Sequence, residues 1–183
     1  MSKFIVVTGG NGFIGSHLIK ELLNQNYKPI LLLRENAKLD RLKDLNTLEF
    51  VETKNYLDKK IIEKLQSFNP MSFVHCAWSG VLGNERNNRI QENNVELSIN
   101  SVKLAKKIGC YNWIGLGSQA EYGSQKTKTN ESLKCKPTTL YGKYKLESGI
   151  KCLDLSKKLN LQAKWVRVFS TYGPLDNDSW LIP

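Results

Sequence analysis

The sequence predicts an α/β fold in which a parallel sheet carries helices on both faces. Two observations support this fold class. Strand-like and helix-like segments alternate along the whole chain, which favours a parallel sheet with helical crossovers. The first strand also leads through a glycine-rich turn directly into a helix. A length of 183 residues is enough for one domain with a hydrophobic core.

Six segments carry strand signals, and helical segments lie between them. The expected strands are Lys3–Thr8, Pro29–Arg34, Leu48–Glu52, Ser72–Cys76, Asn112–Leu116 and Ala163–Phe169. The expected helices are Phe13–Asn24, Ala37–Asp44, Asp58–Phe68, Arg89–Ile108 and Thr138–Leu159. Right-handed crossovers then give a doubly wound sheet. We therefore expect residues 1–183 to form one Rossmann domain that binds a dinucleotide.

Two segments fall outside this alternation. Gly123–Pro137 is polar and shows no periodicity, so it is expected to form a surface loop beside the site. The chain stops at Trp180-Leu181-Ile182-Pro183, directly after the turn-rich Tyr172-Gly173-Pro174. Natural chain ends are often polar or helical, so we expect this sequence to be a fragment of a longer protein.

The glycine-rich turn is the most informative motif. Gly9, Gly12 and Gly15 stand three residues apart between an apolar strand and an amphipathic helix. Glycines permit the tight turn and let the backbone approach a pyrophosphate closely. The following helix directs free N–H groups and the positive end of its dipole at the negative charge. This context favours phosphate binding over an ordinary strand–turn–helix connection.

Composition and charge exclude several other classes. The formal net charge is +10, but the lysines are scattered and no basic cluster alternates with aromatic residues, which disfavours nucleic-acid binding. No segment reaches the roughly 18 apolar residues of a membrane span, and no signal peptide is visible. Cys76, Cys110, Cys135 and Cys152 are widely spaced, so we expect reduced thiols in the cytoplasm and neither a metal site nor disulfides.

The end of the second strand bears on the choice of dinucleotide. In dinucleotide-binding folds this position meets the adenosine ribose: an acidic residue accepts from the 2′-hydroxyl of NAD, and an arginine suits the 2′-phosphate of NADP. Arg34 falls there, and its planar guanidinium matches a phosphate. Glu35 follows directly and leaves NAD as the alternative. On position alone, NADP is favoured.

A tyrosine and a lysine share one helix face near the end of the chain. Tyr141 and Lys145 are four residues apart in the expected helix Thr138–Leu159. A phenol with a reference pKa of about 10 is a weak acid–base catalyst, and a nearby ammonium favours the phenolate and lowers that pKa. Taken alone, the pair is more easily explained as an ordinary surface helix.

A serine marks the carboxyl end of the fifth strand. Ligands of such sheets bind outside the carboxyl ends of the strands, so Ser118 is expected to face the same crevice as the glycine turn. There it could donate a hydrogen bond to a substrate oxygen. A Ser–His–Asp hydrolase is disfavoured, because the chain has only His17 and His75 and lacks a G-x-S-x-G motif.

The glycine turn, the strand-end serine and the Tyr-x-x-x-Lys pair occur in an order that resembles the extended short-chain dehydrogenase/reductase family, the group of nucleotide-sugar epimerases, dehydratases and reductases. Weaker matches follow the same order along essentially the whole chain. They are Val74-His75-Cys76-Ala77, Asn93-Asn94-Val95 and Arg167-Val168-Phe169-Ser170-Thr171-Tyr172-Gly173-Pro174.

The resemblance implies a hydride-transfer site. Tyr141 would be the general acid–base, Lys145 would hold the nicotinamide ribose and depress the tyrosine pKa, and Ser118 would bind the reacting sugar oxygen. Other cofactor contacts would come from Gly9, Gly12, Phe13, Ile14, Gly15, Ala77, Asn94 and Phe169, with Asn55 and Tyr56 near the adenine. The family usually has an aspartate where Asn55 falls and an asparagine where Ser170 falls. Its members continue into a smaller substrate-binding part, which we expect to be missing here.

The resemblance narrows the reaction without fixing it. Dehydratases of the family carry an Asp-Glu pair directly after the strand-end hydroxyl, whereas Ser118 is followed by Gln119 and Ala120, with Glu121 one position later. Dehydration is therefore disfavoured. A 4-epimerase or 4-keto reductase acting on a nucleotide sugar is expected, and Arg34 inclines the choice towards reduction.

Two other classes stay open. A catalytically silent dinucleotide-binding module is opposed by the intact Ser118, Tyr141 and Lys145 set. An interaction domain is the second alternative, since the two long helices would pair between subunits of a homodimer in this family. Their apolar residues, which are more often plain core, are Ile90, Val95, Leu97, Val102, Leu104, Leu146, Ile150, Leu153 and Leu159.

Overall fold

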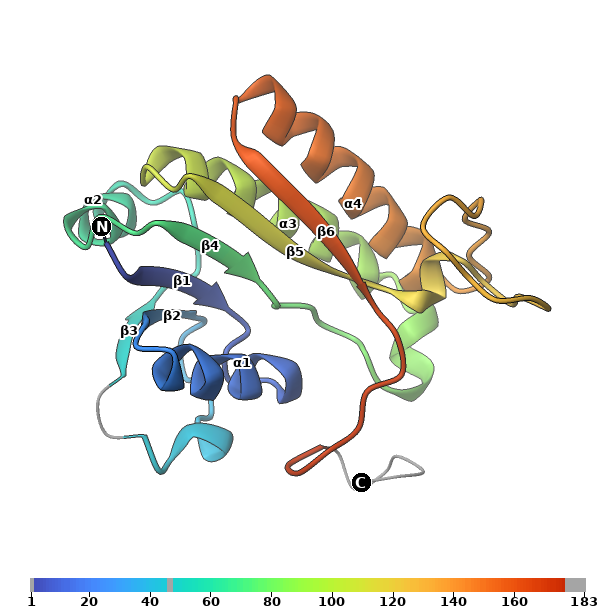
Figure 1. Cartoon of the computed structure of the whole chain (residues 1–183), viewed down its shortest axis with the longest axis horizontal. Helices are drawn as coiled ribbons and strands as arrows, with labels where there is room; N and C mark the ends of the chain where they lie inside the picture. The colour runs from blue at the N-terminus through green and yellow to red at the C-terminus, as the bar shows by residue number, and fades with distance from the viewer. Residues whose placement is uncertain (1, 46–47, 177–183) are drawn as a thin grey trace.

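A computed structural model describes residues 2–45 and 48–176 and shows a six-stranded, all-parallel sheet (Figure 1). The strands are β1 (Phe4–Thr8), β2 (Lys28–Leu33), β3 (Glu49–Glu52), β4 (Ser72–His75), β5 (Asn112–Ser118) and β6 (Gln162–Val168). Their order across the sheet is β3-β2-β1-β4-β5-β6, and every neighbouring pair is parallel. The strand order reverses direction between β1 and β4, which is where ligands bind in such sheets. The doubly wound α/β prediction is confirmed.

Helices cover both faces of the sheet. They are α1 (Phe13–Asn24), α2 (Lys59–Ser67), α3 (Ile90–Lys107) and α4 (Leu140–Lys158). The α1 face buries Val7, Ile19 and Leu31, and the opposite face, with α2, α3 and α4, buries Leu65 and Trp113. Because β1 and β2 are covered on both sides, they read as continuous apolar runs, as parallel strands do.

Local chemistry explains where two of the helices begin. The Asp58 carboxylate accepts a hydrogen bond from the backbone N–H of Lys60 at 2.8 Å and caps α2. The Thr139 hydroxyl accepts from the N–H of Gly142 at 3.1 Å and caps α4. Such caps satisfy N–H groups that the first helical turn leaves without partners. The α4 cap fixes the start of the helix that carries Tyr141 and Lys145.

The expected helix Ala37–Asp44 is wrong. Only the 3₁₀ turn η1 (Asp40–Leu42) forms there, and its N-cap residue Leu39 offers no side-chain cap. Asn36 has φ 56°, which turns the chain before the segment. A stretch this short gains too few hydrogen bonds to offset helix nucleation. Leu39, Leu42 and Leu45 instead pack into the core on the α1 face.

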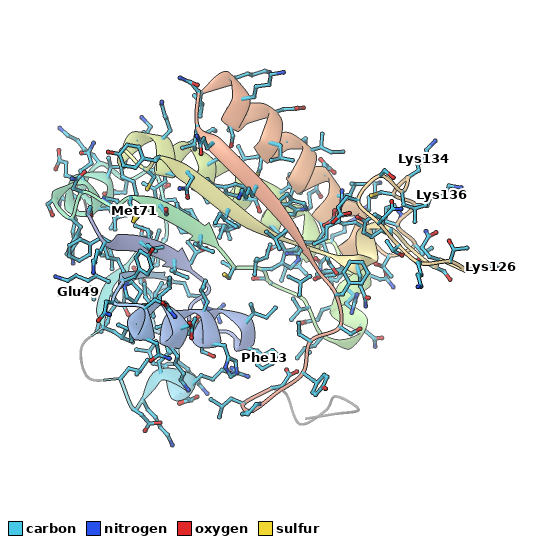
Figure 2. The ribbon with its side chains drawn as sticks, in the orientation of Figure 1. Phe13, Glu49, Met71, Lys126, Lys134 and Lys136 are labelled. Atoms are coloured by element: carbon cyan, nitrogen blue, oxygen red, sulfur yellow. The ribbon has the colours of Figure 1, made fainter. Side chains whose placement is uncertain are left out.

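The stretch 123–137 contains no helix or strand, so the expected loop is confirmed. Figure 2 shows Lys126, Lys134 and Lys136 projecting from it at the end of the molecule that carries the start of α4. Two further 3₁₀ turns, η2 (Gly83–Asn87) and η3 (Gln119–Glu121), lie near this loop and line one cavity with it. The expectation about the chain end at residues 180–183 lies outside the described residues.

Candidate active site

A cleft of about 510 Å³ opens at the carboxyl ends of the strands. Several segments contribute to its wall, among them the glycine turn, the segment after β4, the end of β5, the start of α4 and the chain after β6. The structure brings together nine of the predicted site residues in this cleft. They are Gly9, Gly12, Phe13, Ile14, Gly15, Ser118, Tyr141, Lys145 and Phe169.

The glycine turn is shaped by close backbone approach. Gly9 has φ +66°, and a Cβ there would lie 2.5 Å from the backbone nitrogen of Ala77. A Cβ on Gly15 would overlap the Gly9–Gly10 backbone. Helix α1 begins after Gly12, which has no side chain to cap it, and its first turn holds no acidic residue. The free N–H groups at this end of α1 therefore suit the pyrophosphate of a dinucleotide.

Ser118 is the last residue of β5 and is largely buried. Its hydroxyl accepts a hydrogen bond from the N–H of Ala120 at 3.1 Å, which turns the chain into η3. The single hydroxyl proton can be donated to Tyr141, where a hydrogen bond with Ser118 lowers the pKa of the phenol, or to a ligand oxygen in the cleft.

Tyr141 lies in the first turn of α4 between two other side chains. The Arg86 guanidinium lies 4.5 Å from the centre of its ring, and the Trp78 ring meets it edge-on at 6.0 Å. Burial raises the pKa of the Tyr141 phenol, while Ser118 and the positive charge of Arg86 oppose that rise. The resemblance implied that Lys145 depresses this pKa. In the structure the cation that lowers it is Arg86.

Lys145 lines the cleft and is largely buried. Its ammonium donates a hydrogen bond to the Leu116 carbonyl at 2.7 Å and lies 3.8 Å from the centre of the Trp78 ring. Burial lowers the pKa of Lys145 to about 7, and the negative charge of Glu121 opposes this. One turn of α4 separates Lys145 from Tyr141, and the ammonium lies 5.9 Å from the tyrosine ring centre. The pair lies on one helix face, as the sequence spacing predicts.

The Glu121 carboxylate is fully buried and hydrogen-bonded to other groups of the protein. One carboxylate oxygen accepts from the Ser118 N–H at 2.8 Å and from the Trp165 indole at 2.9 Å. The other accepts from Arg167 at 2.7 Å. These bonds join the end of β5 to β6, so Glu121 holds the end of β5 in place, and both of its oxygens already accept hydrogen bonds.

Five predicted cofactor contacts lie outside the cleft wall. Asn94 is buried in α3 and uses both ends of its amide on the backbone of Ser79, donating to the carbonyl at 3.0 Å and accepting from the N–H at 2.9 Å. It therefore ties the loop after β4 to α3. Ala77 packs its backbone against Gly9.

The other three lie near β2 and β3. Arg34 is exposed at the end of β2. The Asn55 side chain accepts from the N–H of Leu57 at 2.9 Å within its own turn. Tyr56 packs against the core, and burial raises its pKa to about 12. Sequence reasoning brought these residues to the correct end of the sheet but not into the cleft.

Trp78, Arg86 and Arg41 line the cleft and were missed by sequence reasoning. Trp78 and Arg86 belong to the irregular segment between β4 and α3, and Arg41 belongs to η1. A signal was available for the first two, because any loop at the carboxyl end of a strand next to the switch point faces the ligand. The segment has no periodicity that would have shown which of its side chains turn inward.

The part of the chain that the structure describes contains no helix long and apolar enough to cross a membrane. It also holds no group of three or more His, Cys, Asp or Glu residues placed to bind a metal ion. All four cysteines are free thiols.

The parallel sheet and the cleft at its switch point together define a Rossmann-type domain. The model of the NAD dependent epimerase/dehydratase family matches residues 5–183, and the chain belongs to that family. This agrees with the resemblance seen in the sequence motifs.

Similar proteins come from several organisms. ADP-L-glycero-D-manno-heptose-6-epimerase of Brachyspira hyodysenteriae is 30% identical over 94% of this chain and 56% of its own length. UDP-glucose 4-epimerase 2 of Arabidopsis thaliana is 26% identical over 94% of this chain and 52% of its own length. The crystal structure of UDP-glucose 4-epimerase from Brucella ovis in complex with NAD superposes with a TM-score of 0.79, at 26% identity over 91% of this chain and 52% of that chain. The chain thus spans about half the length of the relatives it matches.

Proposed function

We propose that this chain forms the cofactor-binding and catalytic part of an enzyme that oxidises and reduces a sugar carbon of a nucleotide sugar, as a 4-epimerase or a 4-keto reductase. One observation carries the proposal. Ser118, Tyr141 and Lys145 line the same cleft as the glycine turn. A proton-transfer group therefore faces the space where a dinucleotide bound at the glycine turn would place its nicotinamide.

The dinucleotide, when bound, supplies the hydride acceptor or donor, and the protein residues handle protons and positioning. Ser118 would donate its hydroxyl proton to the sugar oxygen and orient it. The Tyr141 oxygen would take the proton of a sugar hydroxyl during oxidation and return it during reduction. The Arg86 guanidinium and the Ser118 hydroxyl would favour the phenolate, and the Lys145 ammonium would hold the nicotinamide ribose.

Dehydration of the sugar is the weaker alternative. It requires an acid and a base in addition to the tyrosine, and each must reach the proton that it transfers. Glu121 is the carboxylate nearest to the dehydratase pattern, and its oxygens are bonded to Ser118, Trp165 and Arg167. Freeing Glu121 would leave the Arg167 guanidinium without its carboxylate partner. Because the Glu121 carboxylate is already hydrogen-bonded to protein groups, epimerisation or reduction is favoured over dehydration.

Two observations move our choice of dinucleotide from NADP towards NAD. Arg34, the residue that favoured NADP, is exposed and is not part of the cleft wall. The similar Brucella ovis enzyme is in complex with NAD. A parallel titration with NADH and NADPH, followed by nicotinamide fluorescence, tests this. We expect NADH to bind at least as tightly, and a clear preference for NADPH would restore the role of Arg34.

The reaction itself is tested with the full-length protein that contains this chain, NAD and UDP-glucose, followed by separation of UDP-glucose from UDP-galactose. Interconversion at any measurable rate supports the proposal, and a second assay with NADH and a 4-keto nucleotide sugar covers the reductase. Dinucleotide binding without turnover in either assay would instead favour the catalytically silent module.

We also propose a homodimer and a reducing compartment. Ile150 and Leu153 of α4 are exposed, three residues apart on one helix face, and suit a helix-pair contact with a second copy. The four free thiols fit the cytoplasm, where thiols stay reduced.

A further inference from the structure

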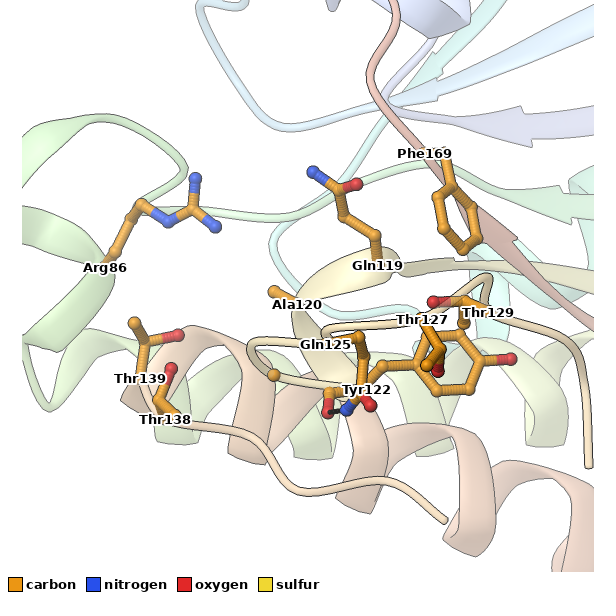
Figure 3. Close-up of a pocket in the computed structure, with 11 residues that line it drawn as sticks. Arg86, Gln119, Ala120, Tyr122, Gln125, Thr127, Thr129, Thr138, Thr139 and Phe169 are labelled. Atoms are coloured by element: carbon orange, nitrogen blue, oxygen red, sulfur yellow. Dashed lines mark hydrogen bonds between the residues drawn. The ribbon is translucent and has the colours of Figure 1, made fainter. Parts of the chain in front are cut away.

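A second cavity of about 420 Å³ adjoins the cleft on the side of Tyr141. We call it the side cavity. Arg86, Gln119 and Phe169 line both hollows and therefore form the boundary between them. In Figure 3, Arg86 and Phe169 stand at opposite ends of the side cavity with Gln119 between them, while Thr138 and Thr139 form its floor near Arg86.

The lining has a distinct chemical character. Threonine hydroxyls and glutamine amides dominate the wall. Among the described residues that line it there is no aspartate or glutamate, and Arg86 is the one charged side chain. Groups of this kind can donate hydrogen bonds to oxygen atoms, and a guanidinium matches an oxyanion in particular. The side cavity therefore suits a ligand that carries both hydroxyl groups and a negative charge.

The Arg86 guanidinium forms no ion pair with any carboxylate among the described residues. It lies over the face of Tyr141, 4.5 Å from the ring centre. A cation over an aromatic ring keeps its N–H groups free at the edge of the guanidinium. Arg86 is thus held beside the reacting position with donors to spare.

The place of the side cavity indicates which part of a substrate would enter it. It shares no residue with the glycine turn, where a pyrophosphate would bind, and it adjoins Ser118 and Tyr141 through Gln119 and Arg86. A group in it would therefore belong to the sugar and not to the dinucleotide. The loop 123–137 supplies the far wall through Gln125, Thr127 and Thr129.

We propose that the side cavity receives an acidic group on the sugar of the nucleotide-sugar substrate, with the Arg86 guanidinium as its charged anchor. This inference rests on the proposed function and narrows the substrate class to nucleotide-activated sugar acids, such as hexuronates. Arg86 acts here as a specificity-determining residue, in addition to its effect on Tyr141.

The experiment compares three probes that differ stepwise: UDP, UDP-glucose and UDP-glucuronic acid. Their dissociation constants are measured by calorimetry with the full-length protein that contains this chain, saturated with NAD. The variants are Arg86→Gln and, as a matched control, Arg89→Gln, since Arg89 is exposed and lines neither cavity. We expect UDP-glucuronic acid to bind the wild-type chain about tenfold more tightly than UDP-glucose, because a charged hydrogen bond is worth roughly that factor.

Arg86→Gln should remove that preference and leave the affinities for UDP and UDP-glucose within about twofold of wild type. An equal loss for all three probes would overturn the inference by placing a nucleotide phosphate on Arg86. Unchanged affinities in Arg86→Gln would overturn it as well. If the wild-type chain binds NAD and UDP-glucose and turns the sugar over, such a result removes only the acidic-sugar assignment. If it binds no UDP probe, the proposed function fails with it.

Discussion

At the scale of single residues, Tyr141 is controlled by its neighbours on three sides. Ser118 and Arg86 lower the pKa of the phenol, and burial raises it by a larger amount. The net shift is upward in the absence of ligands. A base with this pKa would be mostly protonated at neutral pH, so bound dinucleotide and substrate would have to complete its environment. Tyr141 is suited to hold a proton until the cleft is filled.

Substituting phenylalanine for Tyr141 removes the proton-transfer group and keeps the ring between Arg86 and Trp78. We expect Tyr141→Phe to reduce turnover of the nucleotide sugar by about 10² to 10⁴, the usual contribution of a general acid–base. NADH affinity, measured by nicotinamide fluorescence, should change by less than about twofold, because the glycine turn is untouched. Turnover that persists in this variant would show that another group transfers the proton.

Lys145 should make the stability of the protein depend on pH in a specific direction. Burial lowers its pKa from 10.5 to about 7 in the folded state. Between these two values the unfolded chain binds more protons, so the free energy of unfolding rises with pH in this window. Below about pH 7 both states are protonated, and the full cost of burying the charge is present.

This dependence is measured by urea unfolding of wild type and Lys145→Met at about pH 7 and about pH 8.5. Methionine has a similar length and does not titrate. The wild-type free energy of unfolding should gain about 1 to 2 kcal/mol on that of the variant over this interval. Burial raises the pKa of the Cys76 thiol to about 12, and the thiol contribution cancels because both proteins carry the same cysteines. A constant difference between the two proteins would mean that Lys145 titrates normally.

At the scale of elements, α4 is held against β6 by a close contact between a glycine and a tryptophan. A Cβ on Gly149 would lie 2.6 Å from the indole nitrogen of Trp165, which donates to Glu121. Helix propensity favours alanine over glycine by roughly 0.5–1 kcal/mol. Overpacking of a tight contact costs about 1–3 kcal/mol and should outweigh that gain. We therefore expect Gly149→Ala to destabilise the protein in urea unfolding.

The paired variant Trp165→Leu provides the control for this contact. Leucine removes the indole that a Cβ at position 149 would meet. In the Trp165→Leu background, Gly149→Ala should become neutral or stabilising, since only the helix propensity remains. Equal effects of Gly149→Ala in both backgrounds would contradict the contact as the cause.

The same scale shows what the sequence could and could not predict. Ser118, Tyr141 and Lys145 could be predicted to lie at one edge of the sheet, and they do line one cleft, because their positions follow from local rules: a strand end and an i, i+4 pair. Arg86 and Trp78 were missed because their positions depend on tertiary contacts. Trp78 donates to Gln91 at 2.7 Å, and Asn94 holds the backbone of Ser79. Those bonds join the segment after β4 to α3, and no local sequence pattern predicts them. The prediction of a helix at 37–44 was wrong because the leucines of this segment pack into the core without forming a helix.

At the scale of the whole molecule, the sheet gathers the site from segments far apart in the sequence. Gly9, Ser118 and Tyr141 meet because β1, β4 and β5 are adjacent and parallel, so their carboxyl ends share one edge. Lys145 and Glu121 are buried behind that edge and fix the end of β5 from beneath. The assembly of this cleft therefore depends on the order of the strands in the sheet, because no single motif supplies all of its residues.

The exposed apolar side chains of α4 lead to a prediction about assembly. Ile150 is 54% exposed and Leu153 is 38% exposed, although both sit on a helix whose other face packs against the sheet. Burying both on a second copy would remove apolar area from water, whereas a glutamate at each position would put charge into the contact.

We expect sedimentation equilibrium to give a dimer for the wild-type chain and a monomer for the double variant Ile150→Glu, Leu153→Glu. Lys158→Glu places the same side chain elsewhere on the exposed surface of α4 and should remain dimeric. A wild-type chain that stays monomeric at high concentration would contradict the homodimer, while an unchanged dimer in the double variant would place the contact on another surface.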